Sequence, residues 1–564
     1  MGLNIQKTGS ISNFGRRSWP PKDSHDLSFC RFLCGSLASQ SSLPGKLGLV
    51  HACGQGNPVQ DRFIAARLSC RGMEPNTLQK RLKEETLDPA DWSEFRQFAH
   101  RVLDDAIEHA SGIRQLPVWR GVPEVVKAEL REPPPPEEPE GAFAAYEDFR
   151  RLVLPYTYAN IHPRAWGWVI GAGTVSSIIH EMLMAALNAN VFGTEQSPVY
   201  VERQVLGWFK QKLGYPAEAS GLLVSGASMA NLVGLAVART RATGGAVVRQ
   251  GVQGWPRRFT IYCSREAHYS ITKATAVLGL GSDALRRLPV DEKFRLSIPD
   301  LVSCLSADRQ NGRTPLCVVG AAGTTNTGAI DDLEELAKIS NQFGVWFHVD
   351  GAFGAPLKLS SSLAPLVSGI EKADSVAFDL HKWMHASQGT GCMLTRHPQW
   401  HQATFSVPAS YTSSQTRGIA SANMRLLEYS VEGSRPFRAL GAWLAIKEYG
   451  FKKYARLIEQ NVAQARMMAD LVREQPQLRL LAANLNIVCF QFVSPGLTEL
   501  EISELNRELL YRLHETGMAA PSYTDLNGRF VIRVSITNHR TTSEDVVLFV
   551  REAVRIGREL VNTL

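Results

Sequence analysis

Short apolar runs rich in β-branched residues alternate with segments of helical periodicity between residues 161 and 440. The clearest runs lie at 221–224, 258–264, 316–322, 345–350 and 375–380. Strands that alternate with helices predict an α/β domain whose mainly parallel sheet is covered on both faces. Because open sheets of this kind bind ligands beyond the carboxyl ends of their strands, the polar residues that follow these runs are candidates for a functional site.

The chain before residue 161 has a different pattern. Asp88 and Pro89 predict the start of a helix. An apolar stripe then recurs at helical spacing through Trp92, Phe95, Ala99, Val102, Leu103, Ala106 and Ile107. A proline-rich linker follows at residues 132–140, so this amphipathic helix is separate from the next element. Its apolar face packs either on its own chain or, as an arm, on a second subunit.

These patterns divide the chain into four parts. We expect residues 1–72 to form a disordered or targeting-like tail, and residues 73–160 to form a helical arm with its linker. Residues 161–440 form a large ligand-binding domain, and residues 441–564 a small C-terminal α+β domain. The tail is rich in Ser, Gly and Arg without periodicity, which is typical of disorder. Its arginines also fit a weak organelle-targeting segment.

Charge and apolar patterning exclude several classes of partner. Residues 1–72 supply +6 of the formal net charge of +7, because they hold nine Lys and Arg against three Asp. The remaining chain is nearly neutral, so no groove for nucleic acid is expected. No apolar run reaches the roughly 18 residues that cross a membrane. The nine cysteines form no metal-like CxxC pair. We therefore expect no membrane contact, no metal, and a reducing, cytoplasmic location.

The segment SGASMAN, residues 225–231, follows the first apolar run and opens a helical pattern. Small residues allow the backbone to approach an anion, and the first amides of a helix point at it with roughly half a positive charge. Ala227 and Ser228 are therefore candidates for holding a phosphate group. A Gly-Ala-Ser turn before a helix is also common without any ligand.

Two further candidates follow later runs. His268 lies just beyond 258–264, where its flat ring could stack on a planar ligand, although a histidine at a strand end is often purely structural. Thr325 follows 316–322 and offers a hydroxyl donor, with ordinary turn chemistry as its alternative. Neither residue type is specific by itself.

Asp350 and Lys382 carry the strongest chemical signal. Asp350 ends the run 345–350, where a buried carboxylate is costly unless a partner such as a protonated pyridine nitrogen holds it. Lys382, beside His381, follows the next run and supplies an amine nucleophile. A pyridoxal phosphate (PLP) site requires this pair, because the amine binds the aldehyde and the carboxylate keeps the ring nitrogen protonated.

The stretches HVDGAFG and DLHKW, at 348–354 and 379–383, resemble the group II PLP-dependent decarboxylases, the family of aromatic-amino-acid, glutamate and cysteine-sulfinate decarboxylases. The resemblance covers roughly Leu87 to the C-terminus. It implies the aspartate-aminotransferase-like (fold type I) architecture, a homodimer and PLP as the cofactor. It also implies decarboxylation of an L-amino acid to an amine and CO2 through an external aldimine and a quinonoid. The implied catalytic residues are Lys382, His268 and Asp350, with further cofactor contacts from Ala227, Ser228, Thr325, Ala352 and His381.

The resemblance leaves the substrate open between aromatic and acidic side chains. NANVFGTEQSPV resembles the acidic-substrate branch, and EGSRPFRALGAW equally resembles the aromatic branch. The residues that the resemblance places near the substrate side chain are Trp168, Gly171 and Phe192. Arg533 is the candidate for a bidentate contact to a substrate carboxylate, with a structural salt bridge as its alternative.

Two positions depart from the family pattern. Leu426 stands where the family places a mobile-loop tyrosine that protonates the substrate carbon; Tyr411 and Tyr429 lie nearby without being clearly equivalent. Without that tyrosine, oxidative decarboxylation-deamination to an aldehyde is the alternative, as is a catalytically silent PLP-binding dimer. Asp379 stands where many members have an asparagine. Its charge would repel a phosphate unless hydrogen bonds intervene.

Overall fold

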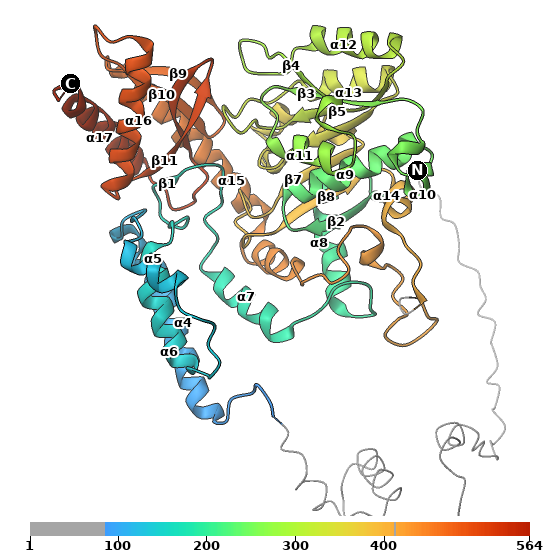
Figure 1. The fold of residues 1–564 in the computed structure, drawn as a ribbon, viewed down its shortest axis with the longest axis horizontal. Helices are drawn as coiled ribbons and strands as arrows, with labels where there is room; N and C mark the ends of the chain where they lie inside the picture. Colours follow the sequence, from blue (N-terminus) through green and yellow to red (C-terminus); the bar gives the residue numbers. More distant parts are fainter. Residues whose placement is uncertain (1–84, 411–412, 564) are drawn as a thin grey trace, which may run out of the picture. The chain divides into compact units, whose positions relative to one another are not determined.

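The computed structural model describes residues 85–410 and 413–563 (Figure 1). Its contacts divide the chain into Met1–Ala90 and Asp91–Leu564, and the elements below belong to the second unit. The predicted tail, residues 1–72, lies outside the described residues. Within the described ranges, no helix combines the length and apolarity needed to cross a membrane.

The largest element of the fold is a seven-stranded sheet in the order β2-β8-β7-β6-β5-β3-β4. Neighbours from β7 to β4 pair in parallel, whereas β8 runs antiparallel to both of its neighbours. The expected mainly parallel sheet is confirmed, and the apolar pattern misses only β4, which is partly polar, and β8. The strands are β2 (Ser220–Val224), β3 (Phe259–Ser264), β4 (Leu285–Leu288), β5 (Thr314–Ala321), β6 (Trp346–Asp350), β7 (Ser375–Asp379) and β8 (Gly391–Thr395).

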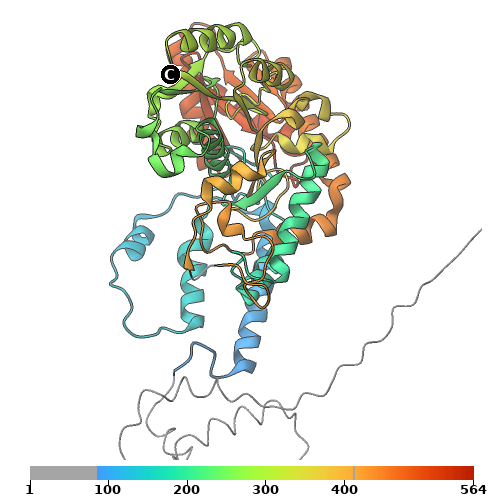
Figure 2. The same cartoon turned by 90° about the vertical axis from the view of Figure 1, so that its right-hand side faces the viewer.

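Helices cover both faces of this sheet (Figure 1 and Figure 2). Side chains alternate along each strand, so Ile261 and Cys263 of β3 join an apolar cluster with α9 and α11, whereas Tyr262 joins the cluster that includes α8, α12 and α13. Burial on both faces explains the continuous apolar runs in the sequence. The covering helices are α8 (Ser197–Leu213), α9 (Ala227–Ala242), α11 (Tyr269–Val277), α12 (Ile298–Gln310), α13 (Leu333–Gln342) and α14 (Pro398–Phe405).

A second, five-stranded sheet has the order β1-β11-β12-β10-β9 and is antiparallel except between β1 and β11. Its strands are β1 (Ala165–Trp166), β9 (Leu478–Asn484), β10 (Ile487–Phe492), β11 (Ala520–Leu526) and β12 (Arg529–Ser535). The helices that pack on it are α15 (Ala439–Glu474), α16 (Glu499–Glu515) and α17 (Ser543–Val561). Since α15 contributes Leu440 to the first core and Met468 to the second, and β1 comes from far upstream, the boundaries at residues 161 and 441 stay predictions.

The first helix of the N-terminal arm begins later than the sequence predicts. Its helices are α4 (Trp92–Gly112), α5 (Glu124–Arg131) and α6 (Ala142–Asp148). The helix starts after Asp91 and not at Asp88, because the Asp91 carboxylate accepts hydrogen bonds from the Ser93 and Glu94 amides at 2.7 and 3.1 Å. The start predicted at Asp88 and Pro89 is therefore wrong.

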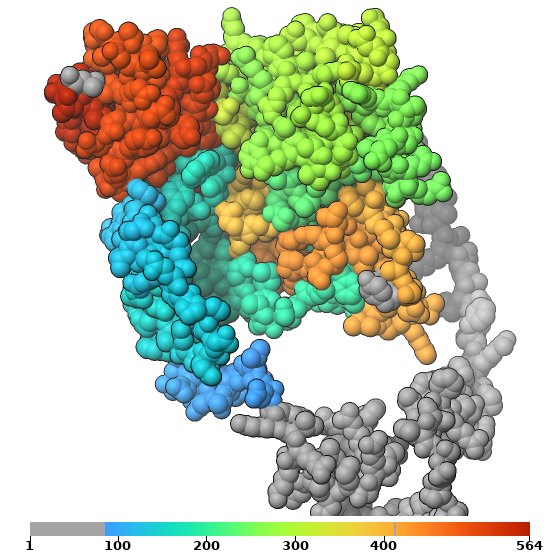
Figure 3. Space-filling view, in the orientation of Figure 1, coloured from blue at the N-terminus to red at the C-terminus, as the bar shows by residue number. Residues whose placement is uncertain are grey.

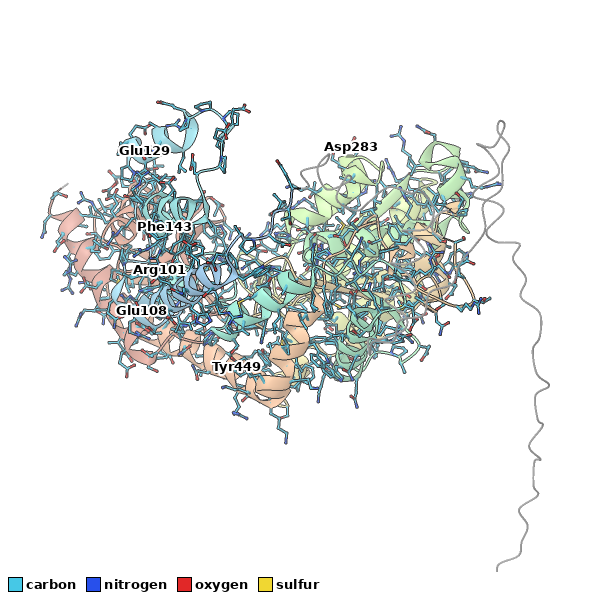
Figure 4. The ribbon with its side chains drawn as sticks, turned by 90° about the horizontal axis from the view of Figure 1, so that it is seen from below. Arg101, Glu108, Glu129, Phe143, Asp283 and Tyr449 are labelled. Atoms are coloured by element: carbon cyan, nitrogen blue, oxygen red, sulfur yellow. The ribbon has the colours of Figure 1, made fainter. Side chains whose placement is uncertain are left out.

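The arm packs on itself through aromatic contacts. The rings of Phe98 in α4 and Tyr146 in α6 are 5.8 Å apart, and the Arg101 guanidinium lies 4.6 Å from the Phe143 ring where the two helices meet (Figure 4). No residue of α4 is buried, and Trp92 is 63% exposed. Figure 3 shows the arm, coloured blue to cyan, with much of its surface uncovered.

A fully buried ion pair between Arg435 and Glu202 holds together the elements that pack against β2. The Arg435 guanidinium donates to the Glu202 carboxylate and the Leu223 carbonyl, both at 2.7 Å, and to the Val191 carbonyl at 2.9 Å. The Leu223 amide donates to the same carboxylate at 3.0 Å. Both charged side chains are completely buried. This pair therefore joins α8, β2 and the turn before α8 to the segment that leads into α15.

Replacement of Arg435 by methionine is expected to lower the free energy of unfolding by about 3–5 kcal/mol, because Glu202 is left as an uncompensated buried charge. The measurement is urea-induced unfolding followed by fluorescence. The matched control is Arg473→Met, which breaks the exposed pair of Arg473 with Asp470 and should change stability little. Equal losses of unfolding free energy in the two variants would contradict the stabilising role of the buried Arg435 pair.

Candidate active site

The carboxyl ends of five strands bring the candidate residues to one edge of the large sheet. β2, β3, β5, β6 and β7 run in the same direction. Ala227 and Ser228 follow β2, His268 follows β3, and Asp350 ends β6. Lys382 follows β7. Strands that are separated along the chain thus deliver one cluster of polar side chains.

The first turn of α9 already binds a carboxylate. The helix starts at Ala227, two residues before the Met229 at which its apolar pattern begins, and the Ala227 amide donates to Asp379 Oδ1 at 2.6 Å. The side chain of Ser228 is exposed beside it. A Cβ at Gly391 of β8 would lie under 3.0 Å from the Gly226 backbone, so a glycine there is needed for the close approach of this turn. The amide cradle is present, and an acidic side chain occupies part of it.

Asp379 also pairs with the lysine. Lys382 Nζ lies 3.2 Å from Asp379 Oδ2, and His381 Nδ1 lies 3.6 Å from Asp379 Oδ1. His381 Nδ1 also donates to the Thr390 carbonyl at 3.0 Å, which leaves its Nε2 available to another group. Asp379 is only 3% exposed, yet its carboxylate has a backbone amide and an ammonium group as partners.

Asp350 is held from two sides. Its Oδ1 accepts from the Ala352 amide at 3.1 Å, and its Oδ2 accepts from Asn231 Nδ2 at 3.0 Å. Sequence reasoning misses Asn231, although it lies one helical turn after Ala227 and therefore on the same side of α9. The same Asn231 nitrogen donates to Ser270 Oγ at 2.9 Å. One side chain thus connects the end of β6 with the start of α11.

His268 joins this cluster through Ser270. It is the N-cap of α11, where its Nδ1 accepts from the Ser270 amide at 3.3 Å and lies 2.8 Å from Ser270 Oγ. Burial lowers the pKa of His268; the Asp350 carboxylate raises it, and the Lys382 ammonium lowers it further. Burial therefore favours the neutral imidazole. His268 therefore has the structural role of a helix cap. Its ring also lies close enough to Asp350 and Lys382 for their charges to shift its pKa.

Gly171 lies directly on the backbone of Lys382. Its amide donates to the His381 carbonyl at 3.2 Å, and a Cβ at this position would lie far under 3.0 Å from the His381 and Lys382 carbonyl oxygens. Trp168 and Phe192 make no hydrogen bond, ion pair or ring contact with the cluster among the described residues. Trp168 packs its ring on Tyr158, and the Phe192 carbonyl accepts from the Leu427 amide.

Arg533 lies on β12 with an incomplete set of partners. It donates through Nε to the Asn326 carbonyl at 3.2 Å and through Nη1 to Ser522 Oγ at 2.9 Å, while Nη2 is buried without a partner. No acidic residue pairs with it in the described part of the chain, so the salt-bridge alternative is not found there. Burial lowers the pKa of Arg533 to about 10. Asn326 directly follows Thr325, so Arg533 borders the turn that carries this candidate.

The segment where the family tyrosine is expected is packed into the core. Leu426 is completely buried, and Tyr429 is half-buried with its ring against His401, 4.9 Å between centroids. Neither contacts Lys382 or Asp350 by a hydrogen bond or ring contact. Tyr411 lies outside the described residues. Within those residues, no cluster of His, Cys, Asp and Glu could hold a metal ion, so the expected lack of a metal stays a prediction.

Comparison with known proteins decides the family. The family model described as the pyridoxal-dependent decarboxylase conserved domain matches residues 123–493, more than half of the chain. This chain belongs to the pyridoxal-dependent decarboxylases. An aromatic-L-amino-acid decarboxylase of Bacillus atrophaeus is 30% identical over 83% of this chain and 96% of its own length.

Two further relatives extend the comparison. A phenylacetaldehyde synthase of Arabidopsis thaliana is 26% identical to this decarboxylase over 84% of this chain and 97% of its own length. The crystal structure of Oryza sativa TDC with PLP and tryptamine superposes with a TM-score of 0.77 at 24% identity, over 85% of this chain and 99% of that chain. The fold is therefore that of the fold type I PLP enzymes, and the chain is a PLP-dependent amino-acid carboxy-lyase.

The donor set of this decarboxylase fits PLP. The exposed Ser228 hydroxyl and the first amides of α9 suit a phosphate, the buried Asp350 carboxylate suits a protonated ring nitrogen, and the Lys382 amine, 20% exposed, suits an aldehyde. The one chemical conflict is Asp379, because it places a negative charge where the phosphate would also be held.

Gly171→Ala is expected to weaken PLP binding about tenfold or more, because the added Cβ must push the Lys382 backbone away from its position. A titration of the apoprotein with PLP, followed by absorbance, measures this change. The control Gly207→Ala lies in α8, where a Cβ meets nothing within 4 Å, and it should leave PLP affinity unchanged. Unchanged affinity in the Gly171 variant would show that the contact is irrelevant to the site.

Asp379→Asn is expected to tighten PLP and inorganic phosphate binding about tenfold, because the amide keeps an acceptor for Ala227 and removes the negative charge that opposes the phosphate. Competition between phosphate and PLP in an equilibrium titration measures both. Asp374→Asn is the control, since Asp374 precedes β7 and accepts from the Phe347 amide at 2.8 Å at the other end of the strand. Weaker binding to the Asp379 variant would refute the repulsion.

Proposed function

We propose that this decarboxylase converts an aromatic L-amino acid to the corresponding amine and CO2. The observation that carries the proposal is the convergence of Lys382, Asp350 and the N-terminus of α9 at one edge of the sheet. The aromatic class is favoured because the relative from Bacillus atrophaeus, an aromatic-L-amino-acid decarboxylase, matches over nearly its whole length. An acidic amino acid is the alternative that the sequence leaves open.

The proposed roles follow from the chemistry of the donors. When bound, PLP supplies an aldehyde that joins the substrate amino group and a ring that accepts the electron pair left when CO2 departs. Lys382 holds the aldehyde before the substrate arrives, and Asp350 holds the ring nitrogen in its protonated form. His268 covers the ring face. The remaining contacts are the phosphate ligands Ala227, Ser228 and His381, and Thr325 and Ala352 at the ring edge.

The substrate is proposed to meet a second group of residues. Arg533 has a buried Nη2 without a partner, and a carboxylate would satisfy that donor by a charge-assisted hydrogen bond. Gly171 has no side chain beside the Lys382 backbone, and we propose that this leaves room for a flat substrate side chain. Trp168 and Phe192 are proposed to border the far end of the pocket, as the family resemblance implies.

The product depends on how the reacting carbon receives its proton. We take the amine as the product, although Leu426 is buried and offers no proton. The aldehyde is the second candidate, because the phenylacetaldehyde synthase matches over 97% of its length and no tyrosine contacts Lys382 in the described residues. A catalytically silent PLP-binding dimer is the third.

A homodimer in the cytoplasm is part of the proposal. The arm leaves large apolar side chains uncovered, including Trp92, Phe95 and Ile107, and a second subunit would bury them. Reduced thiols support a reducing compartment, since the cysteines in the described residues are all free: Cys263, Cys304, Cys317, Cys392 and Cys489.

The test is a screen of the purified protein with PLP against the twenty amino acids and cysteine sulfinate, with amine, aldehyde, CO2 and hydrogen peroxide measured together. Aromatic amino acids are expected to give amine and CO2. Lys382→Ala should give no turnover, and Asp350→Ala should bind PLP weakly with negligible turnover. Near-normal rates in the Asp350 variant would defeat the proposed role of this carboxylate. Stoichiometric aldehyde and peroxide would select the second candidate, and no product from any amino acid would select the third.

A further inference from the structure

A row of buried polar side chains runs behind Asp350 and meets it through Asn231. Trp346 Nε1 donates to Ser375 Oγ at 2.8 Å, Ser375 Oγ lies 2.7 Å from His348 Nδ1, and His348 Nε2 lies 2.8 Å from Asn231 Oδ1. All four side chains are buried to 1% exposure or less. No proposed chemical step uses them, although buried polar groups are costly and replaceable by apolar ones.

The two ends of the row fix the direction of every hydrogen bond in it. The Trp346 indole can only donate, and an ionised Asp350 can only accept. Asn231 must therefore turn its amide nitrogen to Asp350 and its oxygen to His348. His348 then carries its proton on Nε2, and its Nδ1 accepts from the Ser375 hydroxyl. Burial lowers the pKa of His348 to about 4, so the ring is neutral at pH 7 and has one donor and one acceptor.

The helix that carries Asn231 approaches this row because residue 234 has no side chain. A Cβ at Gly234 would lie 2.9 Å from two ring atoms of His348 and 3.2 Å from Ser375 Oγ. α9 can therefore lie directly on β6 and β7. The sequence thus provides the polar side chains and, through Gly234, the close approach of α9 to them.

We infer that Asn231, held in one orientation by His348, is a positioning residue that aligns Asp350 and His268 together on the PLP ring. Its single amide nitrogen donates to Asp350 Oδ2 and to Ser270 Oγ. The Ser270 hydroxyl in turn faces His268 Nδ1. The group that is proposed to hold the ring nitrogen and the group proposed to cover the ring face therefore share one support. This inference rests on the proposed function and deepens it.

The test compares PLP with an analogue in which a C–H group replaces the ring nitrogen. Each is titrated into the apoprotein, and the ratio of the two affinities is the readout. The wild type should prefer PLP, because only the nitrogen pairs with Asp350. Asn231→Ala should reduce this preference about tenfold, because the carboxylate loses a donor that fixes it, and affinity for the analogue should change little. Equal losses of both affinities would indicate a merely structural role and overturn the inference.

Two His348 variants test the orienting part and remain decisive if the Asn231 variant does not fold. His348→Gln retains a side-chain N–H for Asn231 Oδ1 and should retain most of the preference for PLP. His348→Leu has no donor and should lose it. Equal preferences in these two variants would show that His348 does not orient Asn231.

Two control variants distinguish a failure of the inference from a failure of the proposed function. Asn506→Ala removes another buried amide, in α16, that accepts from the Phe492 amide at 2.7 Å; it should lower the melting temperature and leave the preference unchanged. Asp350→Ala should abolish the preference. If Asp350→Ala retains it, the proposed pairing with the ring nitrogen fails, and the inference fails with it. If Asp350→Ala loses the preference and Asn231→Ala keeps it, only the inference fails.

Discussion

A carboxylate at the buried end of a strand is stabilised only if hydrogen-bond donors surround it, and the proposed active site is built around this constraint at Asp350. The Ala352 turn supplies one donor, and α9 supplies the other through Asn231. To deliver that donor, α9 must lie against β6 and β7, which the missing side chain at Gly234 allows. The same placement of α9 brings its first turn beside the segment after β7. The helix that donates to Asp350 therefore also carries the proposed phosphate cradle.

Lys382 already has an ion-pair partner before any cofactor is considered. Lys382 pairs with Asp379, which also accepts from the Ala227 amide, while burial favours the neutral imidazole of His268. In the proposed site, an incoming phosphate would meet an anion at the helix N-terminus, and an incoming aldehyde would meet an amine that is held by a carboxylate. PLP bound in this way would rearrange both contacts of Asp379. The cost of this rearrangement is specific to a chain that has aspartate at this position, since an asparagine would keep the acceptor and lose the charge.

Much of this arrangement could be predicted from the sequence, because it depends on strand order and element ends. Apolar runs that end in Asp350 or lead to Lys382 place these residues at the same edge once the strands are parallel. What the sequence could not show are contacts between side chains that are far apart in the chain and depend on packing. Asn231 reads as an ordinary helical residue, and the Arg435 pair with Glu202 spans more than 200 positions. The sequence offers two aspartates, Asp88 and Asp91, as candidates for the cap of the first helix. Only the structure shows that Asp91 accepts the amide hydrogen bonds.

The second sheet completes the site by holding the segment that lies on Lys382. Thr537 donates to the Ile170 carbonyl at 2.8 Å, and the Gly171 amide donates to the His381 carbonyl. The irregular segment around residue 171 is thus held between the segments that follow β12 and β7, and only glycine allows the backbones to approach this closely. Arg533 on β12 carries a buried donor without a partner, an arrangement that costs stability unless a ligand satisfies it. The proposed function accounts for both features, since the close approach at Gly171 holds the Lys382 backbone and the Arg533 donor suits a substrate carboxylate.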